Sequence, residues 1–216
     1  YSEMMLEEEV GPLNDKQREY LHNLQDSNRR MVELVNSLLN VSRIELGTFA
    51  IDPAPTNFAA VADEVLVELA PPVAAKNLSL NKQYDPAVPV INADPKLVRI
   101  IFQNLLSNAV KYTPAGGTIT LTISRAGEQV SIKVTDTGYG IPNAARGKIF
   151  TKLFRADNIR DKEAEGTGLG LYIVRAIVEA AGGQIWFDSL EGQGTSFTVT
   201  LPLSGMSKKE GIKGLN

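Results

Sequence analysis

Three polar residues stand at helical spacing in the middle of the chain: Asn104, Asn108 and Lys111. Their segment begins with Asp94-Pro95, a capping carboxylate followed by a proline suited to the first helical turn, so we expect a helix. Positions i, i+4 and i+7 place the three side chains on one helix face. An Asn carbonyl suits Mg²⁺ and a Lys ammonium suits phosphate, which predicts a metal-nucleotide site. A solvated helix face is the alternative interpretation.

A second motif, Asp136-Thr-Gly138-Tyr-Gly140-Ile141, leaves an expected strand and enters a turn. The Asp136 carboxylate could accept a hydrogen bond from an exocyclic amine, and the glycines would let an aromatic ring approach the backbone. Taken alone, the same residues are also typical of an ordinary turn at a strand end.

The third motif, Gly166-Thr167-Gly168-Leu169-Gly170-Leu171, immediately precedes an apolar helical pattern. Free backbone N–H groups at a helix N-terminus form an anion site, so this loop could bind phosphate. The glycine spacing matches neither a Walker P-loop nor a dinucleotide fingerprint. A simple helix start explains the loop equally well.

The elements that must position these motifs alternate between helical and strand patterns. A long amphipathic helix from about Leu13 to Leu46 comes first, and Gly47 with two following prolines ends it. An αβ pattern then fills the rest of the chain, and the order of helices and antiparallel strands favours a sheet covered on one face by helices. The expected elements are helices from Asn57 to about Pro72, over 94–112 and from about Thr167 to Gly182, and strands over 78–84, 118–124, 130–135, 184–189 and 195–201.

Composition limits the class of protein. The 22 basic and 25 acidic residues leave a net charge of −3, which gives no general reason to bind nucleic acid. The chain has no cysteine, which fits a reducing compartment, and we take the cytoplasm as the default. No apolar run is long enough to span a bilayer, so a membrane anchor would have to lie in parts outside this sequence. The start at Tyr1 suggests an excised fragment.

Taken in order, the motifs resemble the GHKL ATPase superfamily, and within it the catalytic domain of a sensor histidine kinase from a two-component system. Asn104 to Pro114 is similar to the family's N box, Asp136 to Gly140 to its G1 box, residues 149–154 to its F box, and Gly166 to Leu171 to its G2 box. Gly192-Gln-Gly194-Thr195-Ser-Phe197 resembles the closing strand signature. The resemblance covers Asn57 to about Leu203.

This resemblance implies an α+β fold, a two-layer α/β sandwich of the Bergerat type preceded by a long helical hairpin remnant. It implies ATP and Mg²⁺ as cofactors, with the metal on Asn108, adenine recognition by Asp136, and support of the adenine pocket by Thr195. The family's mobile lid would lie between Pro142 and Glu165. The implied ATP-binding residues are Asn108, Lys111, Tyr112, Asp136, Gly138, Gly140, Ile141, Phe154, Thr167, Gly168, Leu169, Gly170, Leu171 and Thr195.

The resemblance also implies a domain order. Residues 1–47 are expected to be a truncated dimerisation and histidine-phosphotransfer segment, 48–55 a linker, 56–203 the ATP-binding domain and 204–216 a disordered tail. The one histidine, His22, lacks the acidic residue and proline that follow the family's acceptor, so we expect an exposed side chain and an acceptor upstream of Tyr1. The implied partners are a response regulator and, in the parent protein, a second copy joined through the helices.

The family contains both kinases and hydrolases. In the hydrolysing members, a glutamate that activates water lies four residues before the metal-binding Asn, where this chain has Asn104. A neutral amide cannot act as a general base, which favours phosphoryl transfer to a histidine over hydrolysis. Without its acceptor, the fragment is expected not to phosphorylate itself. A GHKL-type hydrolase and an ATP-sensing interaction module remain the alternatives.

Overall fold

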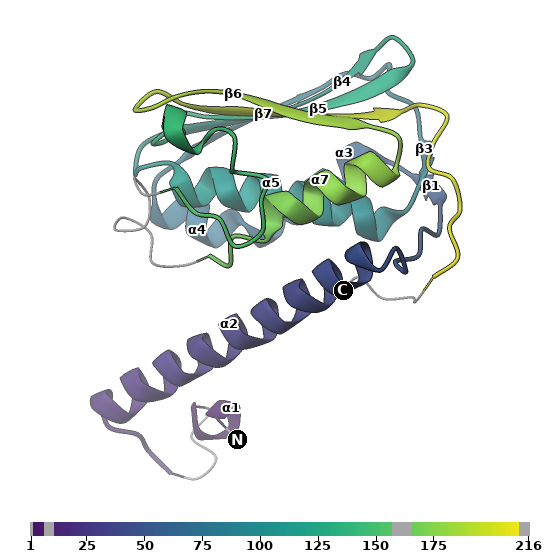
Figure 1. Ribbon diagram of the computed structural model, residues 1–216. Coiled ribbons are helices and arrows are strands. Elements are labelled where there is room, and N and C mark those ends of the chain that lie inside the picture. The colour runs from purple at the N-terminus through teal and green to yellow at the C-terminus, as the bar shows by residue number, and fades with distance from the viewer. Residues whose placement is uncertain (1, 7–10, 157–165, 212–216) are drawn as a thin grey trace. The chain divides into compact units, whose positions relative to one another are not determined.

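The computed structural model describes residues 2–6, 11–156 and 166–211 (Figure 1). It divides the chain into two compact units, residues 1–39 and 40–216, and each is described by itself. The expected domain boundary at residue 47 lies eight residues later than this division, because the last residues of the long helix pack with the second unit. There Asn40 and Val41 are buried and Ile44 packs against the core.

The first unit is helical. Helix α1 spans Ser2–Leu6 and α2 spans Asp15–Glu45, close to the long helix expected from the sequence. At the start of α2 the backbone N–H groups and side-chain oxygens of Asn14 and Gln17 bond reciprocally, each at 2.9 Å, as in a capping box. Gly47 follows the helix at φ 64°. Among the described residues, no helix has the length and apolar character needed to cross a bilayer.

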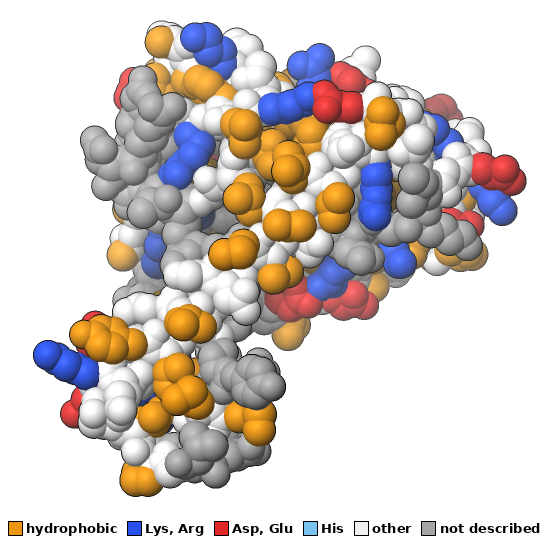
Figure 2. All heavy atoms as spheres, turned by 60° about the horizontal axis from the view of Figure 1, so that its bottom comes forward, with side chains coloured by type: hydrophobic (Ala, Val, Ile, Leu, Met, Phe, Trp, Pro, Cys, Tyr) orange, Lys and Arg blue, Asp and Glu red, His pale blue; other side chains and the backbone are white. Residues whose placement is uncertain are grey.

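Many large apolar side chains of α2 are exposed, and Figure 2 shows hydrophobic side chains gathered at the surface. Within the described residues of this unit these side chains stay exposed, so they form an apolar face. The exposed apolar residues of this unit are Met4, Met5, Tyr20, Leu24, Met31, Val32, Leu34, Val35, Leu38 and Leu39.

The second unit contains a five-stranded sheet in the order β2-β4-β5-β7-β6. Strand β2 runs parallel to β4, and every other neighbouring pair is antiparallel. The sheet strands are β2 (Ser79–Tyr84), β4 (Thr118–Ala126), β5 (Gln129–Asp136), β6 (Gln184–Leu190) and β7 (Gly194–Pro202), and a separate antiparallel pair is formed by β1 (Ala54–Thr56) and β3 (Ile91–Ala93).

Helices cover one face of this sheet, as predicted (Figure 1). Alternation along the strands directs Ile119, Leu121 and Ile123 of β4 into the core. The fold is therefore a mixed two-layer α/β sandwich. The covering helices are α3 (Phe58–Glu68), α4 (Ala70–Ala75), α5 (Pro95–Tyr112) and α7 (Gly170–Ala180), and the 3-10 helix η1 spans Asn143–Ala145.

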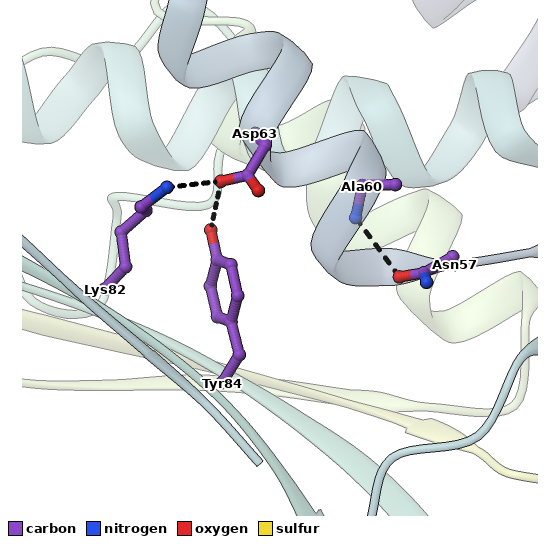
Figure 3. Close-up of polar contacts among 5 residues, drawn as sticks. All are labelled: Asn57, Ala60, Asp63, Lys82 and Tyr84. Atoms are coloured by element: carbon purple, nitrogen blue, oxygen red, sulfur yellow. Dashed lines mark hydrogen bonds and ion pairs between the residues drawn. The ribbon is translucent and has the colours of Figure 1, made fainter. Parts of the chain in front are cut away.

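The sequence predicts helices that begin at Asp94 and at Asn57, and both residues act as N-caps. The Asp94 carboxylate accepts from the N–H groups of Lys96 and Leu97 at the start of α5, and also from Asp52 N–H at 2.9 Å. Asn57 accepts from Ala60 N–H at the start of α3 (Figure 3). Asp94 thus joins the segment before β1 to the helix that carries the predicted site.

A polar contact ties the edge strand β2 to α3 (Figure 3). The Asp63 carboxylate accepts from the Lys82 ammonium and the Tyr84 hydroxyl, both at 2.9 Å. The hydrogen bond from Lys82 holds the pKa of Asp63 below its ordinary value. Burial and the neighbouring carboxylate raise the pKa of Tyr84. The edge of the sheet is therefore held against the helical layer on the side away from α7.

The expected disorder of the 204–216 tail is wrong for residues 204–211. Met206 is buried, Ile51 and Lys209 exchange both backbone hydrogen bonds, and the Lys209 ammonium lies 4.4 Å from the centre of the Phe49 ring. The expectation rested on the low hydrophobicity and high charge of the tail and neglected Met206, whose apolar side chain anchors it. The linker residues Phe49 and Ile51 are themselves buried. Residues 212–216 lie outside the described part.

Candidate functional site

Asp136 is the last residue of β5, and its side chain is buried. The N–H of Gly138 donates to its Oδ1 at 2.8 Å, and the N–H of Thr195 donates to the same oxygen at 3.2 Å. Both bonds recorded among the described residues use Oδ1, so Oδ2 is the oxygen available to a ligand. Burial raises the pKa of this carboxyl to about 6, although the two backbone hydrogen bonds act in the opposite direction.

The turn after Asp136 packs tightly on neighbouring backbone. A Cβ added at Gly138 would lie 2.4 Å from the Tyr112 carbonyl oxygen, and Tyr139 N–H donates to that carbonyl at 3.1 Å. Gly140 has φ 65° and would place a Cβ 2.1 Å from the carbonyl oxygen of Leu190. These glycines therefore allow the turn to lie between the end of α5 and the β6–β7 hairpin.

The three polar residues of α5 have different surroundings. The Asn104 amide donates to the Ile100 carbonyl at 2.8 Å, and its Oδ1 would lie 2.2 Å from a Cβ at Gly170. Asn104 thus packs under the start of α7. Asn108 is half-buried, and no hydrogen bond of its side chain is recorded within the described residues. Its amide oxygen is therefore the better placed of the two for a ligand.

The loop before α7 carries the features of an anion site. Helix α7 begins at Gly170 without a side-chain cap, while Thr167 accepts from Leu169 N–H at 3.3 Å within the loop. A Cβ at Gly166 would lie 2.9 Å from the Lys111 ammonium and 3.9 Å from Arg155 Nε. Uncapped N–H groups, the helix dipole and two cations therefore meet around this loop.

The remaining expected residues contribute mainly apolar surface. Ile141, Phe154 and Leu171 are half-buried and pack against the core, and the half-buried Tyr112 ring lies 5.6 Å from the Lys111 ammonium. Part of the expected lid, residues 157–165, lies outside the described residues. Among the residues that are described, no group of three His, Asp or Glu side chains could hold a metal ion. A metal would need amide oxygens and the oxygens of a bound ligand.

Sequence reasoning missed two residues on the β6 side of the site, Ser189 and Arg146. The Ser189 hydroxyl accepts from Ile141 N–H at 2.8 Å and lies 2.9 Å from the Thr195 hydroxyl. Arg146 donates to the Ser189 carbonyl at 2.6 Å. A signal was present, because Ser189 interrupts the inward-facing apolar positions 185 and 187 of β6 with a polar residue.

Comparison with protein families gives two matches that together span most of the chain. The family described as histidine kinase-, DNA gyrase B-, and HSP90-like ATPase matches residues 93–205. The His Kinase A (phospho-acceptor) domain matches residues 1–47.

Similar curated proteins are bacterial kinases. The circadian input-output histidine kinase CikA of Synechococcus elongatus is 38% identical over 203 residues, which cover 93% of this chain and 27% of the relative. The adaptive-response sensory kinase SasA of Synechococcus sp. strain JA-3-3Ab is 37% identical over 188 residues, covering 87% and 49%. The chain therefore spans about a quarter to a half of the length of these relatives.

Solved structures with the same fold include full-length ShkA in complex with AMPPNP, at TM-score 0.78 and 28% identity, covering 97% of this chain and 42% of that one. The catalytic domain of the histidine kinase ThkA matches at TM-score 0.62 and 27% identity, covering 71% of this chain and 99% of that one.

Proposed function

We propose that this chain binds ATP and transfers its γ-phosphate to a histidine. It belongs to the histidine kinase-, DNA gyrase B- and HSP90-like ATPase family and carries a histidine kinase catalytic domain with a phospho-acceptor-type segment. The observation that carries the proposal is the geometry of Asp136. Its Oδ1 is held by two backbone donors, and its Oδ2 accepts from the exocyclic amine of adenine.

The phosphates bind at the other end of the site. Backbone N–H groups of Gly168–Leu171 at the start of α7 hold phosphate oxygens, and the Lys111 ammonium adds charge beside Gly166. Asn108 would hold Mg²⁺ through its amide oxygen, an oxygen ligand of the kind that this ion prefers. When bound, the ion neutralises charge that builds up on the phosphate oxygens.

The acceptor is a histidine of the dimerisation helices of the parent protein. Its imidazole nitrogen forms a bond to the γ-phosphorus as the bond from that phosphorus to the β–γ bridging oxygen breaks, and ADP leaves. This chain's part is to hold the nucleotide in line for that attack. The phosphoryl group then passes to an aspartate of a response regulator. The absence of cysteine supports the cytoplasm as the place of this reaction.

His22 is not the acceptor in this proposal. It is exposed on α2 and is followed by Asn23, Leu24, Gln25 and Asp26, so it lacks the family pattern of an acidic residue directly after the acceptor histidine and a proline soon after that. The exposed apolar face of α2 supports pairing of residues 1–47 with a second copy in the parent protein. The His22→Gln variant should therefore transfer phosphate to a supplied acceptor domain as well as the original chain does.

Two alternatives fit the same fold: an ATP hydrolase and an ATP-sensing interaction module. The side chain of Asn104 argues against the hydrolase, because it is a neutral amide and its donor group is already bonded to the Ile100 carbonyl. The sensing module would bind ATP without transferring the γ-phosphate to any histidine.

One labelling experiment separates the three functions. The chain is mixed with Mg-ATP labelled at the γ-phosphate and with a helical domain bearing the acceptor histidine from a related kinase. We expect acid-labile label on that domain, lost in Asp136→Asn and retained in Asp188→Asn, a matched control on an exposed part of β6. Steady release of free phosphate without protein labelling would establish the hydrolase instead. Binding of ATP with neither outcome would establish the sensing module.

A further inference from the structure

Ser189 occupies a junction between three segments that surround the base end of the site. It lies at the end of β6, directly opposite Thr195 of β7. Its hydroxyl lies 2.8 Å from Ile141 N, 2.9 Å from the Gly194 carbonyl oxygen and 2.9 Å from the Thr195 hydroxyl. A single half-buried side chain thus joins the turn after Asp136 to the strand that carries Thr195.

The directions of these hydrogen bonds follow from the atoms involved. A hydroxyl has one proton to donate and two lone pairs to accept with. The Gly194 carbonyl can only accept, so the Ser189 proton points to it. The Ile141 N–H can only donate, so it takes one lone pair. The contact with Thr195 therefore uses the Thr195 proton, donated to the second lone pair of Ser189.

This assignment determines what Thr195 presents to a ligand. With its only proton directed at Ser189, the Thr195 hydroxyl offers lone pairs alone. Its backbone N–H is also occupied, since it donates to Asp136 Oδ1. The base end of the site therefore presents two acceptors, Asp136 Oδ2 and Thr195 Oγ1.

The Ser189 backbone strengthens the same junction. Arg146 donates to the Ser189 carbonyl at 2.6 Å, and its guanidinium lies 5.0 Å from the centre of the Phe187 ring. Residues 141 and 146 are thus both attached to Ser189, one through the hydroxyl and one through the carbonyl. The segment between them is anchored on β6 at both ends.

We propose that Ser189 is a positioning residue that sets base selectivity by orienting the Thr195 hydroxyl. The resulting pair of acceptors favours a purine with an amine at position 6, because the amine donates hydrogen bonds. It disfavours a purine with a carbonyl at that position, because the carbonyl oxygen would face other acceptor oxygens with no proton between them. This inference rests on the proposed binding of adenine by Asp136. Ser189 itself need not touch the nucleotide.

The test compares dissociation constants of ATP and inosine triphosphate, measured by displacement of a fluorescent nucleotide from the whole chain. In Ser189→Ala the Thr195 proton is released and can turn toward the base, so the preference for ATP should fall about fivefold or more. Ser189→Thr keeps the hydroxyl and should keep the preference. The matched control is Ser196→Ala, which removes a hydroxyl on the same hairpin that pairs with Thr135 instead, and it should leave the ratio unchanged.

A merely structural role would weaken both nucleotides equally, so an unchanged ratio in Ser189→Ala would overturn the inference. Should that variant fail to fold, Ser189→Cys keeps nearly the same volume with a weak donor and acceptor, and it must lower the ratio. Thr195→Val should lower it too, and adding Ser189→Ala to that variant should lower it no further. If the original chain itself does not prefer ATP to inosine triphosphate, the proposed role of Asp136 fails, whichever way Ser189 behaves.

Discussion

The two ends of the candidate site are built differently. At the base end, formed by Asp136, the turn to Ile141, Ser189 and Thr195, hydrogen bonds within the protein join three segments. At the phosphate end, formed by Asn108, Lys111 and the loop from Gly166, the start of α7 lacks a side-chain cap. The base end is preorganised, whereas the phosphate end keeps donors for the ligand itself.

The two ends also differ in the folding free energy that they cost. Preorganising the base end requires a carboxylate in a buried place, which costs folding free energy because burial disfavours the charged form. The phosphate end uses backbone N–H groups and half-buried side chains, which cost less while the site is empty. Substitutions at the base end should therefore change affinity and stability together, whereas removal of the Asn108 side chain at the phosphate end should change chemistry with little effect on stability.

The largest effect is expected from Asn108→Ala. Loss of the only amide oxygen proposed for Mg²⁺ should slow phosphoryl transfer about 10²- to 10³-fold, as removal of one electrostatic stabiliser commonly does. No bond of the Asn108 side chain is recorded within the described part of the chain, so the free energy of unfolding should stay near its original value. Single-turnover labelling and urea unfolding measure the two quantities.

Gln103→Ala, at an exposed position on the same helix, is the control for Asn108→Ala and should change neither quantity. A large loss of stability in Asn108→Ala would contradict the proposed contrast between the two ends of the site.

The next effect concerns stability at the base end. The native pKa of Asp136 is about 6, above its ordinary value of 3.8, so the native state binds more protons than the unfolded state between these values. Stability should therefore fall as pH rises through this range, and the cost is complete above pH 6. Asp136→Asn should raise the free energy of unfolding by about 2 to 3 kcal/mol at pH 8, even though it weakens ATP binding.

This gain should shrink as the pH falls toward 4, where the original side chain is protonated. Urea unfolding at several pH values provides the measurement, with the exposed Asp188→Asn as the control. A variant less stable than the original chain at pH 8 would show that the two backbone hydrogen bonds to Asp136 outweigh its burial.

A smaller effect is expected on affinity as the pH changes. Two backbone N–H groups already donate to Asp136 Oδ1, so a proton taken up by this carboxyl lies on Oδ2, the oxygen proposed to accept from the adenine amine. ATP affinity should therefore fall about tenfold between pH 7 and pH 5 as Asp136 takes up its proton near pH 6. Calorimetric titration of ATP at each pH gives the measurement. Asp136→Asn is the control, since it retains the titration of the nucleotide itself, and any pH dependence shared with it belongs to the phosphates.

Sequence periodicity and caps were sufficient for most of the fold. The caps Asp94 and Asn57 and the strand alternation predicted helices and strands to within a few residues, because these signals are local. The β1–β3 pair and the packing of Met206 were missed, since both depend on contacts between distant segments. For the same reason the motifs indicated Asp136 but could not indicate that Ser189, more than fifty residues later, orients its neighbour Thr195.

The smallest expected effect is a change in stability that separates the role of Asn104 from that of Asn108. A Cβ at Gly170 would lie 2.2 Å from Asn104 Oδ1, so Gly170→Ala must turn the amide away from the Ile100 carbonyl at a cost of about 1 kcal/mol. Asn104→Ala removes the obstacle, and the double variant should therefore recover most of that loss in urea unfolding. Strict additivity would mean that the two residues do not contact each other. Coupling between them would assign Asn104 to the packing of α7, and leave Asn108 as the amide of α5 that serves the nucleotide.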